Sequence, residues 1–171
     1  MDRDELRRLY NEYADGIYRY LKQLSRSEET AFDLLQETFL RADRYYREVR
    51  NEKAWLYRIA HNLFLDFRGK EREIISDASE EIADQTGAAF TDDVHWELLK
   101  KEILKKLREG NEMYPRIFLL RLDHDLTHKE IADILQSSDR TIRRHFEKIK
   151  NIIAANFSRE LFGEKKGGIF G

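Results

Sequence analysis

Apolar residues recur every three or four positions along most of the chain, the spacing that places one hydrophobic stripe on an α-helix. These stripes predict helices over residues 6–24, 28–46, 53–68, 94–108, 114–122, 127–135 and 139–157. No alternation of apolar and polar residues lasts long enough to indicate a strand. One Pro and eight Gly in 171 residues leave the helical pattern largely unbroken. We therefore predict an all-α fold.

The pattern lapses over residues 71–97, which hold nine acidic side chains, one basic side chain and many small residues. This composition predicts a flexible acidic linker, with a short helix near residues 76–83. The linker divides the chain into two small helical domains, residues 1–70 and 98–160, and a Gly-rich tail over 161–171 that we expect to be disordered. Small domains bury a low fraction of their surface, so this division favours stabilisation by a partner.

The net charge of −2 at pH 7 is the sum of segments with different charge. Residues 1–70 carry +1, residues 71–97 carry −8 and residues 98–171 carry +5. The chain has no Cys, which excludes disulfides and thiolate chemistry and fits a reducing, cytoplasmic location. The charged N-terminus does not resemble a signal peptide, and no apolar run approaches 18 residues, so we expect no membrane span.

Residues 127–150 have the layout of a helix-turn-helix. Thr127 with Glu130 three positions later is a capping-box sequence, residues 136–138 form a short turn, and Ser138 is the predicted N-cap of the second helix. Opposite that helix's apolar stripe lies a largely basic face, made by Arg140, Thr141, Arg143, Arg144, His145 and Lys148. Such a helix can enter the DNA major groove, where Arg recognises guanine and Lys and Thr bind phosphates. A solvated face on a hairpin that binds no DNA is the alternative.

A second basic region covers residues 41–70, with eight Lys/Arg against four acidic side chains. Aromatic residues are interleaved with these charges: Tyr45, Tyr46, Trp55, Tyr57, Phe64 and Phe67. Cations bind phosphates and aromatic rings stack on unpaired bases, so this composition is compatible with single-stranded nucleic acid. Trp55, Phe64 and Phe67 also fit the stripe of a helical core, so a purely structural role stays open.

One face of the second predicted helix is charged, with Asp33, Glu37, Arg41 and Arg44 beside Gln36. The four-residue spacing of Glu37 and Arg41 allows an exposed ion pair worth about 0.3 kcal/mol on a solvated face. A protein-binding face is the alternative.

Catalytic chemistry has little support in the sequence. His124 and His128 have a spacing that metal ligands can use, but they flank a helix start and no third ligand accompanies them. No Gly-rich phosphate loop and no Ser-His-acid motif is present. We expect no enzymatic activity, no cofactor and no metal.

Four segments together resemble one protein family. Residues 33–42 read DLLQETFLRA, 55–66 read WLYRIAHNLFLD, 118–122 read FLLRL and 127–135 read THKEIADIL. In this order they resemble an extracytoplasmic-function sigma factor of bacterial RNA polymerase, and the resemblance extends over nearly all of residues 5–155. It implies two helical domains, called region 2 and region 4, joined by the acidic linker.

The resemblance also implies a role for each surface. The helix around 33–42 would bind the polymerase clamp through Asp33, Leu34, Gln36, Glu37, Phe39, Leu40 and Arg41. Region 2 would recognise and melt the −10 element through Tyr45, Tyr46, Arg47, Arg50, Asn51, Trp55, Arg58, His61 and Asn62. Region 4 would bind the −35 element as duplex through Lys129, Ser138, Arg140, Thr141, Arg143, Arg144 and Lys148.

The implied partners are core RNA polymerase, promoter DNA and an anti-sigma factor, usually membrane-tethered. The acidic linker would pass through the polymerase channels that attract nucleic acid. Three alternatives stay open at this point: an autonomous helix-turn-helix regulator, a helical protein-interaction module and a metal-dependent enzyme that uses His124 and His128.

The chain departs from the family's usual pattern in the turn of the helix-turn-helix. Gln136-Ser137-Ser138 stands where the family usually has Gly-Ile-Ser, and Arg140 replaces a small residue. Losing the Gly predicts a positive φ at Gln136, and losing the apolar residue at Ser137 predicts weaker packing of the two helices. His145 and Phe146 stand where Arg and Leu are commoner, so the −35 sequence preference does not follow from the resemblance.

Overall fold

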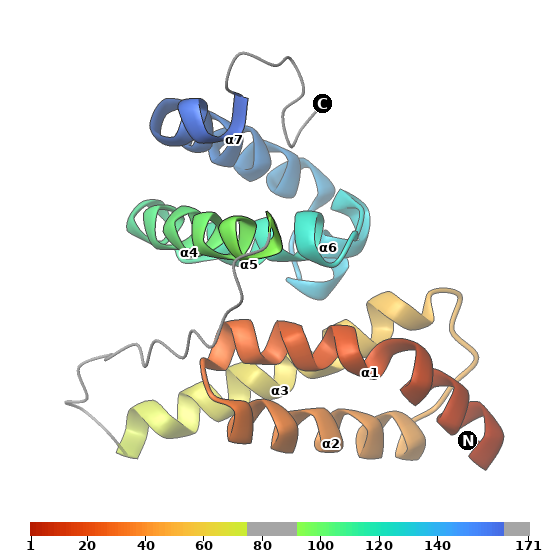
Figure 1. Ribbon diagram of the computed structural model, residues 1–171. Coiled ribbons are helices and arrows are strands. Elements are labelled where there is room, and N and C mark those ends of the chain that lie inside the picture. Colours follow the sequence, from red (N-terminus) through yellow and green to blue (C-terminus); the bar gives the residue numbers. More distant parts are fainter. Residues whose placement is uncertain (75–91, 163–171) are drawn as a thin grey trace.

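The computed structural model describes residues 1–74 and 92–162, with side chains described for 1–71 and 94–159. The N-terminal half consists of α1 (Arg3–Ser25), α2 (Glu28–Arg44) and α3 (Glu52–Ile74). The C-terminal half consists of α4 (Asp92–Gly110), α5 (Met113–Phe118), η1 (Leu119–Asp123), α6 (His128–Ile134) and α7 (Asp139–Phe162) (Figure 1). The described residues contain no strand, so the all-α prediction is confirmed.

The three N-terminal helices form a small bundle around one apolar core. Arg26 adopts a left-handed conformation with φ 57°, and its N–H donates to the Lys22 carbonyl at 2.8 Å, which ends α1. Ser27 then starts α2 by accepting a hydrogen bond from the Thr30 N–H at 3.2 Å. The stripes of the three helices meet in fully buried side chains that include Leu9, Ile17, Leu21, Ala31, Leu56 and Ala60.

The C-terminal half has its own apolar core between α4, α5 and α7. Its fully buried side chains include Ile103, Leu107, Ile117, Phe118, Leu120, Ile142, Ile149 and Ile153. The helix predicted over 114–122 widens after Phe118 into the π-helical turn η1, in which the His124 N–H donates to the Leu119 carbonyl at 3.1 Å. α7 leaves helical geometry at Phe157, with φ −131°, where the predicted stripe ends.

Several helices extend further than predicted, and α1 already begins at Arg3. α3 continues to Ile74 and α4 begins at Asp92, so both ends of the segment expected as a linker over 71–97 are helical. Strong helix formers such as Lys70 and Glu71 favour continuing α3, and acidic residues at the start of α4 complement the helix dipole. α7 reaches Phe162, inside the expected tail. The short helix expected over 76–83 and the disorder expected over 163–171 lie outside the described residues.

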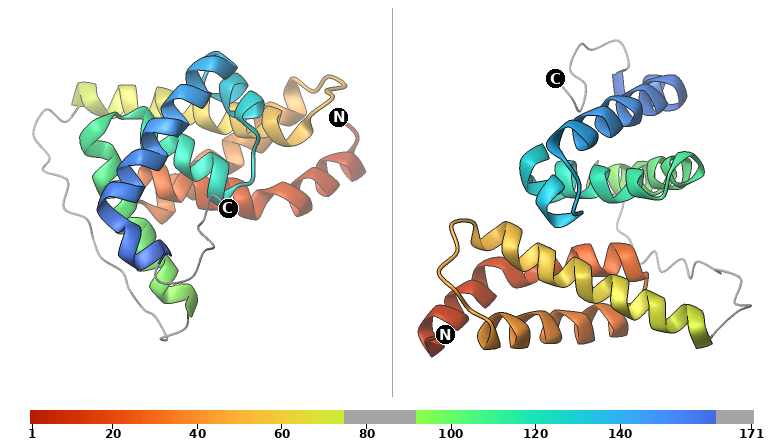
Figure 2. Two further views of the ribbon diagram at one scale, coloured as in Figure 1. Left: turned by 90° about the horizontal axis from the view of Figure 1, so that it is seen from above. Right: turned by 180° about the vertical axis from the view of Figure 1, so that it is seen from behind.

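The two halves of the chain lie against each other, with α6 and η1 next to α3 and the end of α1 (Figures 1 and 2). The contact places the start of the helix-turn-helix on the first turns of α3. Within the described residues, no helix is both long and apolar enough to cross a membrane.

Candidate nucleic-acid interface

The helix-turn-helix begins with the capping box that the sequence predicts. The Thr127 Oγ1 accepts a hydrogen bond from the Glu130 N–H at 3.2 Å. In return, the Glu130 Oε1 accepts one from the Thr127 N–H at 2.9 Å. Two backbone donors at the start of α6 are thereby satisfied, which fixes where the helix begins.

The turn after α6 has a defined backbone geometry. The Ser137 N–H donates to the Ala132 carbonyl at 2.8 Å, and the Gln136 N–H donates to the Asp133 carbonyl at 3.3 Å. This pair of bonds forms a Schellman motif, in which the residue after the helix cap is left-handed. Gln136 has φ 53°, so the predicted positive φ is confirmed for a residue that is not Gly.

Ser138 caps the start of α7, as predicted. Its Oγ accepts a hydrogen bond from the Thr141 N–H at 3.1 Å and donates to the Thr141 Oγ1 at 2.8 Å. The Ile142 N–H donates to the Ser138 carbonyl at 3.0 Å, which continues the first helical turn. α7 is therefore held in a fixed register relative to the turn.

The outer face of α7 is basic and open to solvent. Its exposed basic side chains are Arg140, Arg143, Arg144 and Lys148, with the acidic Glu147 exposed among them. Arg143 is 67% exposed and forms an ion pair with the Asp139 Oδ2 at 3.0 Å. Lys129 and Ser138 are also exposed, and Thr141 is half-buried. Six of the seven expected −35 residues are thus exposed to solvent.

The loop between α2 and α3 presents the expected −10 residues at residues 45–51. Tyr45 is 63% exposed, and Arg47 and Arg50 also lie at the surface. Tyr46 is half-buried, because its hydroxyl donates to Glu5 and its ring contacts Trp55 edge-on at 6.1 Å. One aromatic ring and two cations of this loop are therefore free to reach a ligand.

Asn51 and the first turns of α3 carry the remaining expected −10 residues. The Asn51 Oδ1 accepts a hydrogen bond from the Ala54 N–H at 3.0 Å, which caps α3. Trp55, Arg58 and Asn62 are half-buried along the helix. These side chains extend the loop surface onto α3.

His61 lies in the interior, which corrects its expected place on the DNA-binding surface. It is 2% exposed, and its Nδ1 lies 3.0 Å from the Tyr20 hydroxyl. Burial, reinforced by the nearby Arg116, lowers the pKa of His61 to about 4. A signal for burial was present in the sequence, because Tyr57, His61 and Phe64 follow the same helical spacing.

The outer face of α2 combines apolar and charged side chains. Leu34 and Phe39, expected at the polymerase, are buried in the N-terminal core, whereas Asp33, Gln36, Leu40 and Arg41 are exposed. The predicted pair between Arg41 Nε and Glu37 Oε1 is present at 3.3 Å.

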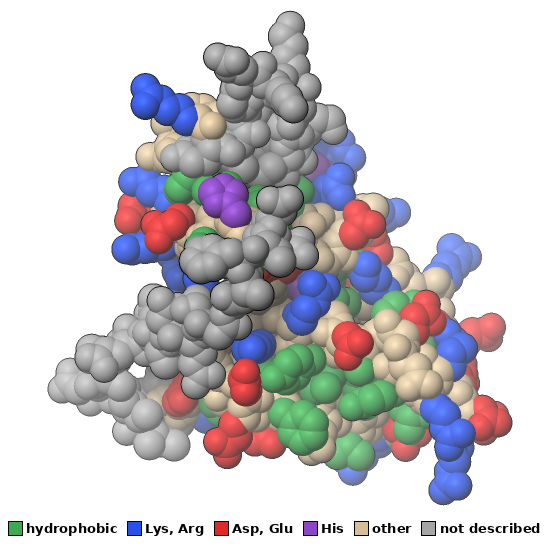
Figure 3. All heavy atoms as spheres, in the orientation of Figure 1, with side chains coloured by type: hydrophobic (Ala, Val, Ile, Leu, Met, Phe, Trp, Pro, Cys, Tyr) green, Lys and Arg blue, Asp and Glu red, His purple; other side chains and the backbone are tan. Residues whose placement is uncertain are grey.

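Phe32 belongs to the same α2 face, although the sequence analysis did not single it out. Phe32 is 49% exposed and Leu40 is 64% exposed. The spacing of Phe32, Gln36 and Leu40 puts them in one row along the helix. Figure 3 shows hydrophobic side chains gathered over α1 and α2.

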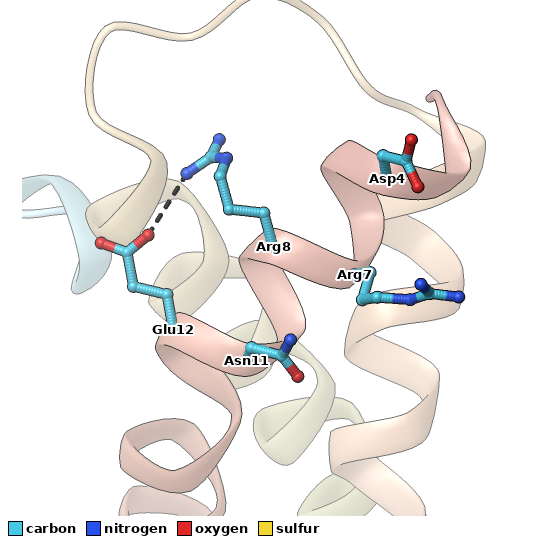
Figure 4. A pocket seen from close by; sticks show the side chains of 5 residues that line it. All are labelled: Asp4, Arg7, Arg8, Asn11 and Glu12. Atoms are coloured by element: carbon cyan, nitrogen blue, oxygen red, sulfur yellow. Dashed lines mark hydrogen bonds and ion pairs between the residues drawn. The ribbon is translucent and has the colours of Figure 1, made fainter.

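α1 supports the loop through a polar surface beside the bundle. A shallow hollow there is lined by Asp4, Arg7, Arg8, Asn11 and Glu12 (Figure 4). Arg8 donates to the Glu12 Oε2 at 3.2 Å and to the Glu52 Oε1 at 2.7 Å. The second contact joins α1 to the first turn of α3, beside the loop. All the lining residues are exposed and polar, which suits a structural surface and not a small-molecule pocket.

A buried polar network connects the two halves. The His124 Nε2 lies 2.9 Å from the Gln23 Oε1, and the His124 Nδ1 lies 2.9 Å from the Tyr57 hydroxyl. Gln23 and Lys100 both donate to the Asp123 Oδ2, Lys100 at 3.2 Å. Since the Gln23 oxygen only accepts, the His124 Nε2 carries the proton and its Nδ1 accepts from Tyr57.

The electrostatics of this network favour a neutral His124. Burial lowers its pKa to about 4, against the opposite effect of Asp123 and with the help of Arg19, Lys53 and Lys100. Burial acts to raise the pKa of Asp123, but hydrogen bonds from Gln23 and Lys100 lower it overall. Burial also raises the pKa of Tyr57 far above its ordinary value, so its hydroxyl keeps the proton that it donates.

His124 and His128, the two histidines considered as metal ligands, contact other side chains in the structure. Both ring nitrogens of His124 are hydrogen-bonded, and the His128 ring lies 4.9 Å from the Phe146 ring. Among residues with described side chains, no three His, Cys, Asp or Glu gather in a way that could hold a metal ion.

Comparison with known proteins gives one consistent family. Sigma-70 region 2 matches residues 9–74, which contain most of α1 and the whole of α2 and α3. The ECF RNA polymerase sigma factor SigM of Bacillus subtilis is 24% identical over 153 residues, covering 88% of this chain and 94% of that protein. The RNA polymerase sigma factor YlaC of the same species is 30% identical over 143 residues, covering 78% and 80%.

A solved structure shares the fold. The sigma factor RpoE of Bartonella quintana, in complex with the anti-sigma factor NepR, matches with a TM-score of 0.69 at 19% identity, covering 88% of this chain and 95% of that one. The relatives, the family match and the helical architecture agree. The chain belongs to the extracytoplasmic-function sigma factors of the sigma-70 family, which direct RNA polymerase to promoters.

Proposed function

We propose that the outer face of α7 binds the −35 element as duplex DNA. The observation that carries this proposal is the exposed basic face of a helix whose N-cap, preceding turn and buried stripe are all in place. In a helix-turn-helix this face lies in the major groove. Arg140, Arg143 and Arg144 can reach base edges and phosphates, while Lys129, Ser138, Thr141 and Lys148 bind the backbone beside them.

The loop at residues 45–51 and the start of α3 are assigned to the −10 element as a single strand. Tyr45 offers an exposed ring for stacking on an unpaired base, and Arg47 and Arg50 offer cations for its phosphates. Asn51, Tyr46, Trp55, Arg58 and Asn62 complete this surface. His61 supports it from the interior and makes no DNA contact.

The outer face of α2 is assigned to core RNA polymerase. Exposed Phe32 and Leu40 beside Asp33, Gln36 and Arg41 have the mixed character of a protein interface. An anti-sigma factor, membrane-tethered as the family resemblance implies, is expected to compete for this face. The chain provides promoter recognition in the cytoplasm, and the polymerase provides the catalysis.

Run-off transcription with core polymerase on a genomic promoter library tests these assignments. Replacing Arg143 and Arg144 by Ala should reduce initiation at −35-dependent promoters at least about 30-fold, because each of the two guanine contacts contributes about 1–3 kcal/mol. The matched control, Lys105→Ala with Lys106→Ala, removes two charges from α4 and should initiate normally.

Two results would contradict the assignments. The first is wild-type initiation by the Arg143 and Arg144 double variant. The second is tight, sequence-specific binding of a duplex by the protein without polymerase, which would favour an autonomous regulator.

A further inference from the structure

The first turns of α3 are bonded to the other half of the chain. The Asn51 Nδ2 donates to the Glu130 Oε2 at 2.6 Å, and the Arg58 Nη1 lies 3.4 Å from the Asp133 Oδ1. Between them, the Lys53 Nζ donates to the His124 carbonyl at 2.6 Å. Two donors of the −10 surface, Asn51 and Arg58, and the neighbouring Lys53 therefore have acceptors from α6 and the residue after η1.

The acceptors resemble the ligand that this surface is proposed to bind. Glu130 and Asp133 present carboxylate oxygens from α6, and DNA presents phosphate oxygens to the same kinds of donor. Arg58 cannot contact the Asp133 carboxylate and a DNA phosphate at the same time. A DNA strand bound to these donors of α3 would have to displace the acidic side of α6.

The buried network beneath this contact holds the halves in register. His124 bonds to Gln23 on α1 and to Tyr57 on α3, so it contacts two helices of the N-terminal half. All of its hydrogen-bonding capacity is used in this arrangement. Separating the halves would expose these groups together, which favours one closed state over a range of loose contacts.

The contact covers only one of the three assigned surfaces. Arg140, Arg143, Arg144 and Lys148 on α7 are exposed in the closed arrangement, and so is the outer face of α2 with Phe32 and Leu40. Closure therefore leaves the duplex-binding and polymerase-binding faces accessible and engages only the part of the −10 surface around Asn51 and Arg58, while Tyr45, Arg47 and Arg50 in the loop stay exposed.

We propose that α6 acts as an internal inhibitor of −10 binding, with Glu130 and Asp133 competing against single-stranded DNA for Asn51 and Arg58. This inference rests on the proposed function of α3. Binding through α2 or α7 can precede opening, and access to the single strand requires the halves to separate. The closed chain without polymerase therefore has a low affinity for single-stranded DNA of any sequence.

Two isosteric changes on α6 test this inhibition. Glu130→Gln keeps an oxygen for the Thr127 N–H but turns an amide donor toward the Asn51 amide. Asp133→Asn removes the carboxylate that pairs with Arg58. The control, Glu102→Gln with Glu109→Gln on α4, raises the net charge by the same two units away from α3. Far-UV circular dichroism verifies that each variant is folded, and Asp133→Asn alone is a milder second variant.

The experiment measures two quantities, the separation of the two halves of the chain and the affinity for DNA. Since the chain has no Cys, Asp15→Cys and Lys105→Cys give specific sites for a donor and acceptor dye, one in each half. We expect Glu130→Gln with Asp133→Asn to lower energy transfer. The same variant should bind a fluorescein-labelled pool of random single-stranded 20-mers at least about fivefold more tightly than the control does. Affinity for duplex 20-mers should match the control within about twofold.

Unchanged energy transfer, or opening without tighter single-strand binding than the control, would overturn the inference. Transcription separates this failure from failure of the proposed function. A wild-type chain that does not initiate with core polymerase would contradict the promoter assignments, and the dye and 20-mer measurements would still report whether α6 blocks α3.

Discussion

Mild acid should destabilise this protein through His61. The folded protein holds this side chain neutral, with its Nδ1 3.0 Å from the Tyr20 hydroxyl and Arg116 nearby. Its pKa is lowered from 6.5 to about 4, whereas the unfolded chain protonates at the ordinary value. The contribution of His61 to stability is therefore fully present above about pH 6.5 and is lost as the pH falls toward 4.

The size of this effect follows from the two pKa values. At pH 5, protonation of His61 increases the statistical weight of the unfolded state by a factor of about 33. It increases the statistical weight of the folded state by a factor of only about 1.1. Their ratio, about 30, corresponds to about 2 kcal/mol. This is a large share of the stability of a small domain, which is about 5–15 kcal/mol.

Urea unfolding followed by far-UV circular dichroism at pH 7 and pH 5 measures the effect. Carboxylates and His124 also titrate in this range, so the decisive quantity is the difference between the wild type and His61→Gln. Gln can still accept a hydrogen bond from Tyr20 but does not titrate. The wild type should lose about 2 kcal/mol more than the variant between these pH values. Equal losses would refute the assignment of a buried, neutral His61.

Three further changes test separate surfaces. Gln136→Gly should raise the free energy of unfolding by about 0.5–1 kcal/mol, because Gly adopts the φ of 53° without strain; a thermal melt with no gain would contradict this. Leu40→Asp should weaken binding to core polymerase at least about tenfold and leave stability within about 0.5 kcal/mol, because the side chain is 64% exposed. Unchanged polymerase affinity would remove α2 from the interface. Lys148→Ala should lower the salt slope of −35 duplex binding by about one, as measured by fluorescence anisotropy, and an unchanged slope would show that Lys148 contacts no phosphate.

Local features of the fold were predictable because they depend on neighbouring residues. The capping box at Thr127, the N-cap at Ser138 and the positive φ of Gln136 each follow from a few consecutive side chains. The stripes also identified most of both cores. Helix ends were less predictable, because the acidic sequence at which α4 begins is typical of a linker and also of a helix N-terminus.

Contacts between the halves had no sequence signal. Tyr57 and His124 are 67 residues apart, and Gln23 and His124 are 101 apart, so no periodicity connects them. For His61, the family resemblance implied DNA contact, although the helical spacing it shares with Tyr57 and Phe64 indicated burial. Its contact with Tyr20 on another helix had no sequence signal. Exposed Phe32 could have been found, since it lies one turn before Gln36 on the face already assigned to a protein partner.

The π-helical turn at Leu119–Asp123 determines the direction in which the following residues point. Each residue of an α-helix advances about 100° around the axis, so one extra residue in a turn rotates everything after it by that amount. This offset directs Asp123 and His124 toward α1 and α3. Deleting one residue in η1 would keep the stripes on both sides and turn His124 away from Tyr57. The number of residues in this single turn therefore determines the rotation at which the two halves of the chain contact each other.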